Sequence, residues 1–252
     1  RLHIRSAALP AAGGRERQEP ERTGKTGAGR AAWWGVEGAE EVLFGAGGVE
    51  GEGYVYDSHT GAALVTYQFS TAPSVINDVA LTPAGAWFTN SFQPELYFVP
   101  ITNGHPGRFT TLRLSGPAAA APPGEINNNG IQATSDGSTL VVAHSSSGAL
   151  NAVNPKTGAS RAIKGLNLPN VDGILMEGRT LYAVQNFVNQ IAEVRLSGDL
   201  TSGSVRKVIR SSLFEVPTTV ARFGDRLAAV NAKFDTGIPP TAASFEVVVV
   251  DR

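Results

Sequence analysis

Residues 77–90 read NDVALTPAGAWFTN, and the same plan returns at residues 129–142 (NGIQATSDGSTLVV), 172–186 (DGILMEGRTLYAVQN) and 218–231 (TTVARFGDRLAAVN). Each copy is a polar residue, a short apolar strand, a turn that contains glycine, and a second strand. The copies start 52, 43 and 46 residues apart, and one four-stranded propeller blade needs about 40 to 50 residues. The repeat therefore predicts an all-β protein with the blades of a β-propeller.

A second repeat marks the outer half of two blades. Residues 54–61 (YVYDSHTG) and 152–158 (AVNPKTG) share a strand, an Asp or Asn, two further residues and Thr-Gly. An Asp or Asn opens such a turn by accepting hydrogen bonds from the backbone ahead of it, and the glycine supplies the positive φ that closes the hairpin. Asp57 and Asn154 are 97 residues apart, so two blades are expected to separate them.

The composition agrees with many short strands. The 252 residues include 29 Gly and 15 Pro, and only 17% are charged, which favours short elements joined by tight turns. The net charge of −1 gives no electrostatic reason to expect nucleic acid or an anionic membrane as a partner. The longest apolar runs, such as residues 247–250, have the length of a strand and not of a membrane helix. We expect a small-molecule substrate as the partner, with a protein partner left open.

The sequence contains no Cys, which excludes disulfides, thiolate catalysis and zinc–thiolate sites. This does not fix the compartment, because secreted proteins can lack disulfides. The chain starts at Arg1, so the absence of a signal peptide carries no information. A secreted or extracytoplasmic location is preferred here, and the cytoplasm stays open.

The pattern divides the chain in two. Residues 1–40 are expected to be an irregular or partly disordered segment, the remnant of a first blade, since residues 13–30 hold no apolar side chain larger than Ala or Pro. Residues 41–252 are expected to form the propeller, with three strands of a first blade up to about residue 70 and further blades starting near 76, 128, 171 and 217. About five blades are recognisable, the first incomplete or degenerate. Either the chain is truncated or its amino-terminal region is unusual.

The start of the innermost strand of each blade is where chemistry is expected, because these strands line the central channel. The residues there are Asn77, Asn129, Asp172 and Thr218. Amide and carboxylate oxygens with one formal negative charge suit a hard cation such as calcium. The alternative is that each polar side chain caps its own strand by bonding to nearby backbone.

A second ring of polar residues is expected where the next strands end, at Asn90, His144, Asn186 and Asn231. His144 is the histidine best placed to bind substrate or to act as a base, and a structural role is the alternative. Trp87, Phe88 and Tyr182 are interpreted as packing between blades rather than as a binding surface.

The sequences Asn77-Asp78-Val, Asn129-Gly130-Ile and Asp172-Gly173-Ile resemble the family of senescence marker protein, gluconolactonase and luciferin-regenerating enzyme, which are six-bladed β-propellers. The resemblance covers about residues 42–252. It implies a divalent metal, usually Ca²⁺, with Asn129 and Asp172 among its ligands. It also implies that Asn77 contacts substrate or metal-bound water, and that Asp172 is the base that activates water to hydrolyse a lactone or related ester.

One family ligand has no counterpart at the expected place. The family supplies a first-blade Glu from a Pro-Glu-Gly sequence, whereas Pro20-Glu21 is followed by Arg here and Pro94-Glu95 lies in a later blade. The sequence therefore leaves two functions open. The first is a divalent-metal-dependent lactone or ester hydrolase with Asn77, His144, Asn186 and Asn231 around the substrate. The second is a non-catalytic propeller that serves as a binding or interaction scaffold.

Overall fold

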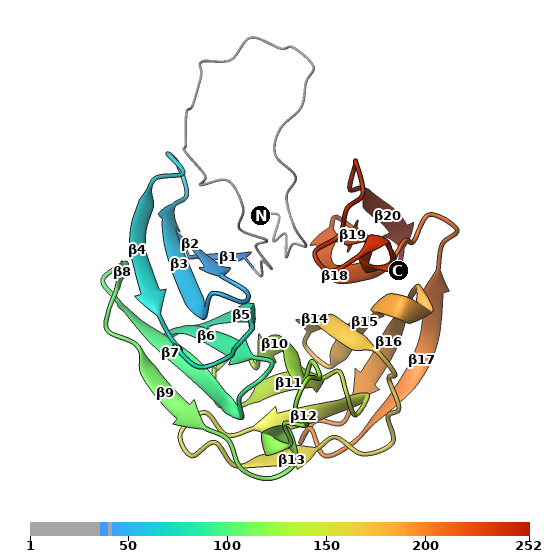
Figure 1. The fold of residues 1–252 in the computed structure, drawn as a ribbon. Coiled ribbons are helices and arrows are strands. Elements are labelled where there is room, and N and C mark those ends of the chain that lie inside the picture. The colour runs from blue at the N-terminus through green and yellow to red at the C-terminus, as the bar shows by residue number, and fades with distance from the viewer. Residues whose placement is uncertain (1–35, 40–41) are drawn as a thin grey trace.

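The computed structural model describes residues 36–39 and 42–252, and within them the chain forms five antiparallel sheets in succession. Each sheet is a meander in which every strand pairs with the one before it, apart from β9, which pairs with β7. The sheets stand side by side around an axis as an arc, with β5, β10, β14 and β18 innermost (Figure 1). This is the arrangement of propeller blades that the repeats predict.

The blades follow one another in chain order. The first blade contains β1 (Val36–Ala39), β2 (Val42–Ala46), β3 (Glu52–Asp57) and β4 (Ala63–Gln68). The second contains β5 (Ile76–Thr82), β6 (Gly85–Asn90), β7 (Glu95–Thr102), the two-residue β8 (His105–Pro106) and β9 (Thr110–Arg113). The third contains β10 (Asn128–Ala133), β11 (Leu140–His144), β12 (Ala149–Val153) and β13 (Ser160–Ala162).

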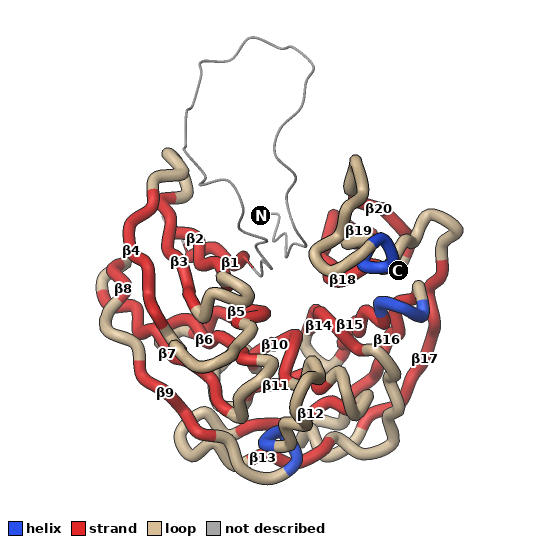
Figure 2. The backbone as a smooth tube through the Cα atoms, in the orientation of Figure 1, coloured by secondary structure: helices blue, strands red, loops and turns tan. Residues whose placement is uncertain are grey.

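The fourth blade contains β14 (Val171–Glu177), β15 (Thr180–Gln185), β16 (Gln190–Leu196) and β17 (Gly203–Arg210). The fifth contains β18 (Pro217–Phe223), β19 (Arg226–Asn231) and β20 (Val247–Asp251). Three short 3₁₀ turns lie in the connections, namely η1 (Pro117–Ala119), η2 (Asn186–Val188) and η3 (Phe234–Thr236) (Figure 2). None of the helical segments in the described part of the chain has the length and apolar character needed to cross a membrane.

The predicted blade starts near 76, 128, 171 and 217 are confirmed, since β5, β10, β14 and β18 begin there. The described residues hold five blades, so the count of six is not reached within them. The expectation of an incomplete first blade is wrong, because β1 completes a four-stranded sheet, and the fifth blade is the one with three strands. β1 was not recognised because it is short and has Glu as its second residue, where the other inner strands have Asn, Asp or Thr. Residues 1–35 and 40 of the predicted irregular segment lie outside the described residues, as does residue 41.

Neighbouring blades are joined by apolar clusters, one between each successive pair. Because successive side chains of a strand point to opposite faces, one strand serves two clusters. On β6, Phe88 packs in the cluster shared with the first blade and Trp87 in the cluster shared with the third. Tyr182 lies between the fourth and fifth blades. The interpretation of these aromatic residues as packing between blades is confirmed.

The outer turns are also as predicted. The Asp57 carboxylate accepts hydrogen bonds from the N–H groups of His59 and Thr60, and Asn154 Oδ1 accepts from the N–H groups of Lys156 and Thr157. Gly61 and Gly158, which close these turns, have φ of 70° and 72°. Asp57 lies in the first blade and Asn154 in the turn that follows β12 of the third, two blades apart.

A β-bulge at the start of β5, β10, β14 and β18 positions the candidate site. The pairing register shifts between Ile76 and Val79, and again at the same place in the third, fourth and fifth blades. A bulge leaves a residue out of the ladder and re-aims its side chain. Here the re-aimed residues are those that begin the repeats, at positions 77, 129, 172 and 218.

Glycine in the repeat lets inner strands approach closely. A Cβ on Gly130 would lie 2.4 Å from the carbonyl oxygen of Asp172, and a Cβ on Gly173 would lie 2.7 Å from that of Thr218. Both distances are shorter than a carbon and an oxygen can approach. The second position of each repeat is therefore glycine in the third and fourth blades because the next inner strand occupies the space of a side chain.

Candidate functional site

The starts of the inner strands carry a repeated polar pair. Asn77 Nδ2 donates to Ser91 Oγ at 3.0 Å, and Asn129 Nδ2 donates to Ser145 Oγ at 3.0 Å. In the fourth blade the direction is reversed, because the acceptor is the Asp172 carboxylate. In each pair, a residue of the bulge meets the residue that directly follows the second strand of the same blade.

Asp172 is the carboxylate of this ring. Its residue is 8% exposed, and Asn186 Nδ2 donates to its Oδ2 at 3.0 Å. Burial raises the pKa of Asp172 from 3.8 to about 7. The hydrogen bonds from Asn186 and Asn129 act against this rise, and the negative charge of Asp78 adds to it. The result is a carboxyl group that exchanges its proton near neutral pH, which is what a general base requires.

Asp78 is a second buried carboxylate near the axis, and it is held by backbone. Its Oδ1 accepts the N–H of Val79 at 2.9 Å, and its Oδ2 accepts the N–H of Ile131 in the next blade at 2.9 Å. Its own N–H donates to Thr89 Oγ1 at 3.0 Å. Asp78 thus joins the inner strands of the second and third blades. No role for Asp78 was predicted from the sequence, although it lies inside the repeat.

Thr218 and Thr219 occupy the corresponding place in the fifth blade. Both residues are buried, and neither hydroxyl has a hydrogen-bond partner within the described residues. An unsatisfied buried hydroxyl is uncommon and costs stability. These two hydroxyl groups are therefore available to bind a water molecule, an ion or a ligand. They extend the polar ring from Asn77 through Asn129 and Asp172 to the last blade.

The residues expected to form a second ring do not all share one register. Asn90, His144 and Asn231 pair with the first residue of their inner strand, but the residue in that register in the fourth blade is Gln185. Asn186 is one position further on and belongs with Ser91 and Ser145. Asn186 was aligned with the wrong residues because the sequence indicates roughly where a strand ends but not which residues pair across two strands.

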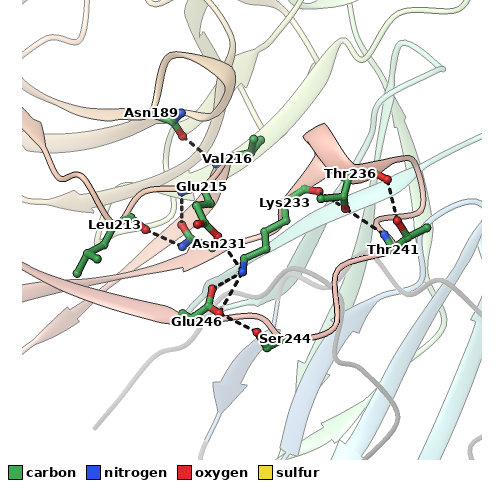
Figure 3. Close-up of polar contacts among 10 residues, drawn as sticks. All are labelled: Asn189, Leu213, Glu215, Val216, Asn231, Lys233, Thr236, Thr241, Ser244 and Glu246. Atoms are coloured by element: carbon green, nitrogen blue, oxygen red, sulfur yellow. Dashed lines mark hydrogen bonds and ion pairs between the residues drawn. The ribbon is translucent and has the colours of Figure 1, made fainter.

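The four side chains in register are buried beneath the connecting loops. Asn90 Oδ1 accepts backbone N–H groups of Val75, Phe92 and Gln93. Asn231 Oδ1 accepts the N–H of Glu215 while its Nδ2 donates to the carbonyl of Leu213 (Figure 3). Gln185 Nε2 donates to the carbonyl of Pro169. Each side chain fastens the loop that leads into its blade.

His144 has the same kind of position. Its Nε2 lies 2.8 Å from the carbonyl oxygen of Ala120, and its Nδ1 lies 3.0 Å from Ser147 Oγ. Ring nitrogens bound on both sides in a buried site favour the structural alternative for this histidine. Its contact with substrate stays a prediction, as does that of Asn77, Asn186 and Asn231.

Sequence reasoning missed the two serines of the ring. Ser91 Oγ donates to the carbonyl of Asn128 at 2.7 Å, and Ser145 Oγ donates to the carbonyl of Val171. Each serine therefore links its own bulge to the inner strand of the next blade. The signal was present, because a serine follows both Asn90 and His144, but a single hydroxyl in a polar loop does not stand out.

The donor chemistry of the ring can be compared with that of a calcium site. Calcium takes six to eight oxygen ligands, with carboxylates, amide oxygens and hydroxyl or water oxygens among them. The ring offers the Asp172 carboxylate, the amide groups of Asn77 and Asn129, and the unpartnered hydroxyl of Thr218. Residues 36–39 and 42–252 contain no group of three or more His, Cys, Asp or Glu side chains able to hold a metal. The oxygen donors fit a hard cation, with one carboxylate to hold it.

No protein-family model and no curated protein sequence matches the chain. Solved structures do match. Virginiamycin B lyase from Staphylococcus aureus aligns at 15% identity with a TM-score of 0.57, over 81% of this chain and 64% of the lyase. Glutaminyl cyclase from Myxococcus xanthus aligns at 13% identity with a TM-score of 0.54, over 79% of this chain and 85% of the cyclase.

A structure of a nidogen/laminin complex aligns at 15% identity with a TM-score of 0.60, over 86% of this chain and 74% of the matched chain. The chain thus spans less than two thirds of the length of the lyase. The matches include enzymes and a protein solved as part of a complex, at identities that establish the fold alone. In fold, the chain is a β-propeller.

Proposed function

We propose that the chain is a hydrolase of lactones or related esters, of the gluconolactonase-like type, whose base is Asp172. The observation that carries the proposal is a buried carboxyl at the start of an inner strand, with a pKa of about 7 and two amide side chains bonded to it. A structural carboxylate gains nothing from such a raised pKa, whereas a base that works at neutral pH needs it.

In the proposed reaction, the Asp172 carboxylate accepts a proton from a water molecule as the water oxygen attacks the carbonyl carbon. The bond between that carbon and the ring oxygen then breaks, and the proton passes from Asp172 to the departing oxygen. Asn186 and Asn129 hold the carboxylate in one orientation. Asn77 and Thr218 lie at the corresponding starts of neighbouring inner strands and are proposed to contact the substrate.

A divalent cation, proposed to be Ca²⁺, would be held by Asp172 and Asn129 with Thr218 and Asn77 nearby. When bound, it would polarise the substrate carbonyl and stabilise negative charge on its oxygen. It would also favour the ionised form of Asp172, since a nearby cation lowers the pKa of a carboxyl group.

The proposal is tested by hydrolysis of simple lactones with Asp172→Asn. Removing a positioned general base costs roughly 10²- to 10⁴-fold in rate, so we expect kcat to fall by that factor with the fold intact. Asp57→Asn is the matched control, since Asp57 lies in an exposed outer turn where Asn154 shows that Asn serves equally well. Equal activity of Asp172→Asn and the parent would overturn the proposal.

The cation is tested separately by calorimetric titration of Ca²⁺ into the parent and into the double variant Asn129→Ala/Asp172→Ala. Binding in the parent that disappears in the double variant is the expected result. A folded parent that hydrolyses lactones without binding any divalent cation would show that Asp172 acts alone, and would remove the metal from the proposal.

A binding scaffold is the second candidate, and one feature favours it. The fifth blade ends in β20, which has no strand on its outer side within the described residues and exposes Val247 and Val249. A free strand edge with apolar side chains is suited to pairing with a strand of another chain. A protein inert toward lactones that binds a partner, and loses the partner on Val249→Lys, would support this candidate instead.

A further inference from the structure

The loop that follows β15 combines a link to Asp172 with two exposed apolar side chains. Asn186, at its start, donates to the Asp172 carboxylate. Phe187 and Val188 come next, and their residues are 53% and 39% exposed. Large apolar side chains at the surface are unremarkable when scattered singly. Here they are adjacent in the chain, and they directly follow Asn186, the residue that is hydrogen-bonded to the proposed catalytic carboxyl.

The loop is fixed at both ends. At its start, the N–H of Asn186 donates to the carbonyl of Asn170 at 3.0 Å, and the N–H of Phe187 donates to Asn186 Oδ1 at 2.7 Å. At its end, Asn189 adopts a left-handed conformation with φ of 52°, and its Oδ1 accepts the N–H of Val216 at 2.8 Å (Figure 3). Phe187 and Val188 are therefore exposed on a turn whose backbone is held by hydrogen bonds at both ends.

The loop between β17 and β18 carries a third exposed apolar residue. Leu213 is 65% exposed, and Asn231 Nδ2 holds its carbonyl oxygen at 2.8 Å (Figure 3). The bond between Asn189 and Val216 joins this loop to the loop of Phe187. We call Phe187, Val188 and Leu213 the apolar lip. All three lie in loops at the end of the blades where the inner strands begin, which is the end that holds Asp172.

We propose that the apolar lip binds an alkyl or aryl substituent of the substrate whose carbonyl group is placed at Asp172, an inference that rests on the function proposed above. Ordering exposed apolar groups beside a site lets binding remove apolar area from water at little further entropic cost. The substrate class is then an apolar lactone or ester. A polyhydroxylated sugar lactone would gain nothing from these side chains.

The test compares γ-decalactone with γ-butyrolactone, which have the same ring and differ by a hexyl chain. For the full chain, kcat/KM is expected to be higher for γ-decalactone. Phe187→Ala is expected to lower the ratio of the two kcat/KM values roughly three- to tenfold, mainly through KM for γ-decalactone, because contact with a few CH₂ groups is lost. Thermal unfolding checks that the variant is folded.

Phe223→Ala is the matched control. Phe223 is 45% exposed and ends β18, at the opposite end of the strand from the proposed site. The Phe223→Ala variant removes the same kind of side chain from a comparably exposed position. The ratio of the two kcat/KM values is expected to stay at the parent value. A ratio that is unaffected by Phe187→Ala, or lowered equally by Phe223→Ala, would overturn the assignment while leaving the hydrolase proposal standing.

A second probe separates failure of the two proposals. 2-Heptylcyclopentanone cannot be hydrolysed, and its binding is measured by calorimetry. If neither lactone is hydrolysed, the hydrolase proposal fails. Ketone binding that weakens in Phe187→Ala but not in Phe223→Ala would still support the apolar lip as a ligand surface. Absence of ketone binding by the folded parent would overturn the lip as well.

Discussion

The inner strands of the second and fourth blades each bury one carboxylate near the axis, and the two are held differently. Both oxygens of Asp78 accept backbone N–H groups, one of them from the third blade. Asp172 is bonded by amide side chains instead, and burial raises its pKa to about 7. The difference follows from their places in the repeat, because Asp78 is the second residue of its copy and bonds to the next blade, whereas Asp172 is the first residue of its copy. The same repeat thus yields a carboxylate that joins blades and a carboxyl that exchanges protons.

The largest effect expected from this difference is on the pH dependence of stability. Between its ordinary pKa of 3.8 and about 7, the Asp172 carboxyl holds a proton in the folded protein that the unfolded chain has released. The folded state therefore gains most below pH 4 and loses this gain as pH rises to about 7. Three units correspond to about 4 kcal/mol.

Asp172→Asn removes the titration and keeps the shape of the side chain. The variant is expected to become more stable relative to the parent as pH rises from 4 to 8, by up to about 4 kcal/mol. Urea unfolding of both proteins across this range measures the difference, in which all other titrating groups cancel. A difference that does not change with pH would show that Asp172 is not shifted.

The next largest effect is expected at Asp78, whose carboxylate stabilises the fold through its hydrogen bonds to backbone. Asp78→Ala leaves the N–H groups of Val79 and Ile131 without this acceptor, and an unsatisfied buried donor costs roughly 1 to 3 kcal/mol. We expect a loss of about 3 kcal/mol in urea unfolding and faster amide hydrogen exchange at Ile131. A loss below 1 kcal/mol would contradict the assignment of Asp78 as a link between blades. Asp57→Ala, in an outer turn, controls for loss of a turn carboxylate.

The smallest effect concerns the groups that hold Asp172. The hydrogen bond from Asn186 favours the ionised carboxylate, so Asn186→Ala is expected to raise the pKa of Asp172 further, by about one unit, since a hydrogen bond to a charged group contributes roughly 1.5 to 3 kcal/mol. The acidic limb of the pH–activity profile would move upward. A downward shift would mean that Asn186 stabilises the protonated form.

The blade starts were predictable because repetition at a fixed spacing reports the fold directly. The copies beginning at Asn77, Asn129 and Asp172 gave the start of each inner strand to within one residue, and the Asp57 and Asn154 turns followed from local hydrogen bonding. β1 could not be found in this way. Its residues, Val36–Ala39, carry Glu at the second position of the strand, where the other inner strands have Asn, Asp or Thr, and they pair with β2.

The site was less predictable, since it depends on register and on contacts between blades. The sequence pointed to Asp172 and Asn129, but not to Asp78, whose role needs the N–H of a residue 53 positions away. It placed Asn186 in register with His144, whereas Gln185 is the residue that pairs with the first residue of β14. Nor could it reveal that Asp172 is buried enough to shift its pKa.

The pKa of Asp172 is the quantity on which the proposed chemistry depends most directly. It is measured by carbon-13 NMR titration of the aspartate carboxyl carbons in the full chain, with Asp172→Asn used to assign the resonance. We predict one aspartate that titrates at about 7, and its absence from the spectrum of Asp172→Asn. An Asp172 resonance that titrates near 3.8 would mean that the carboxyl is hydrated and ordinary, and would contradict its role as a base.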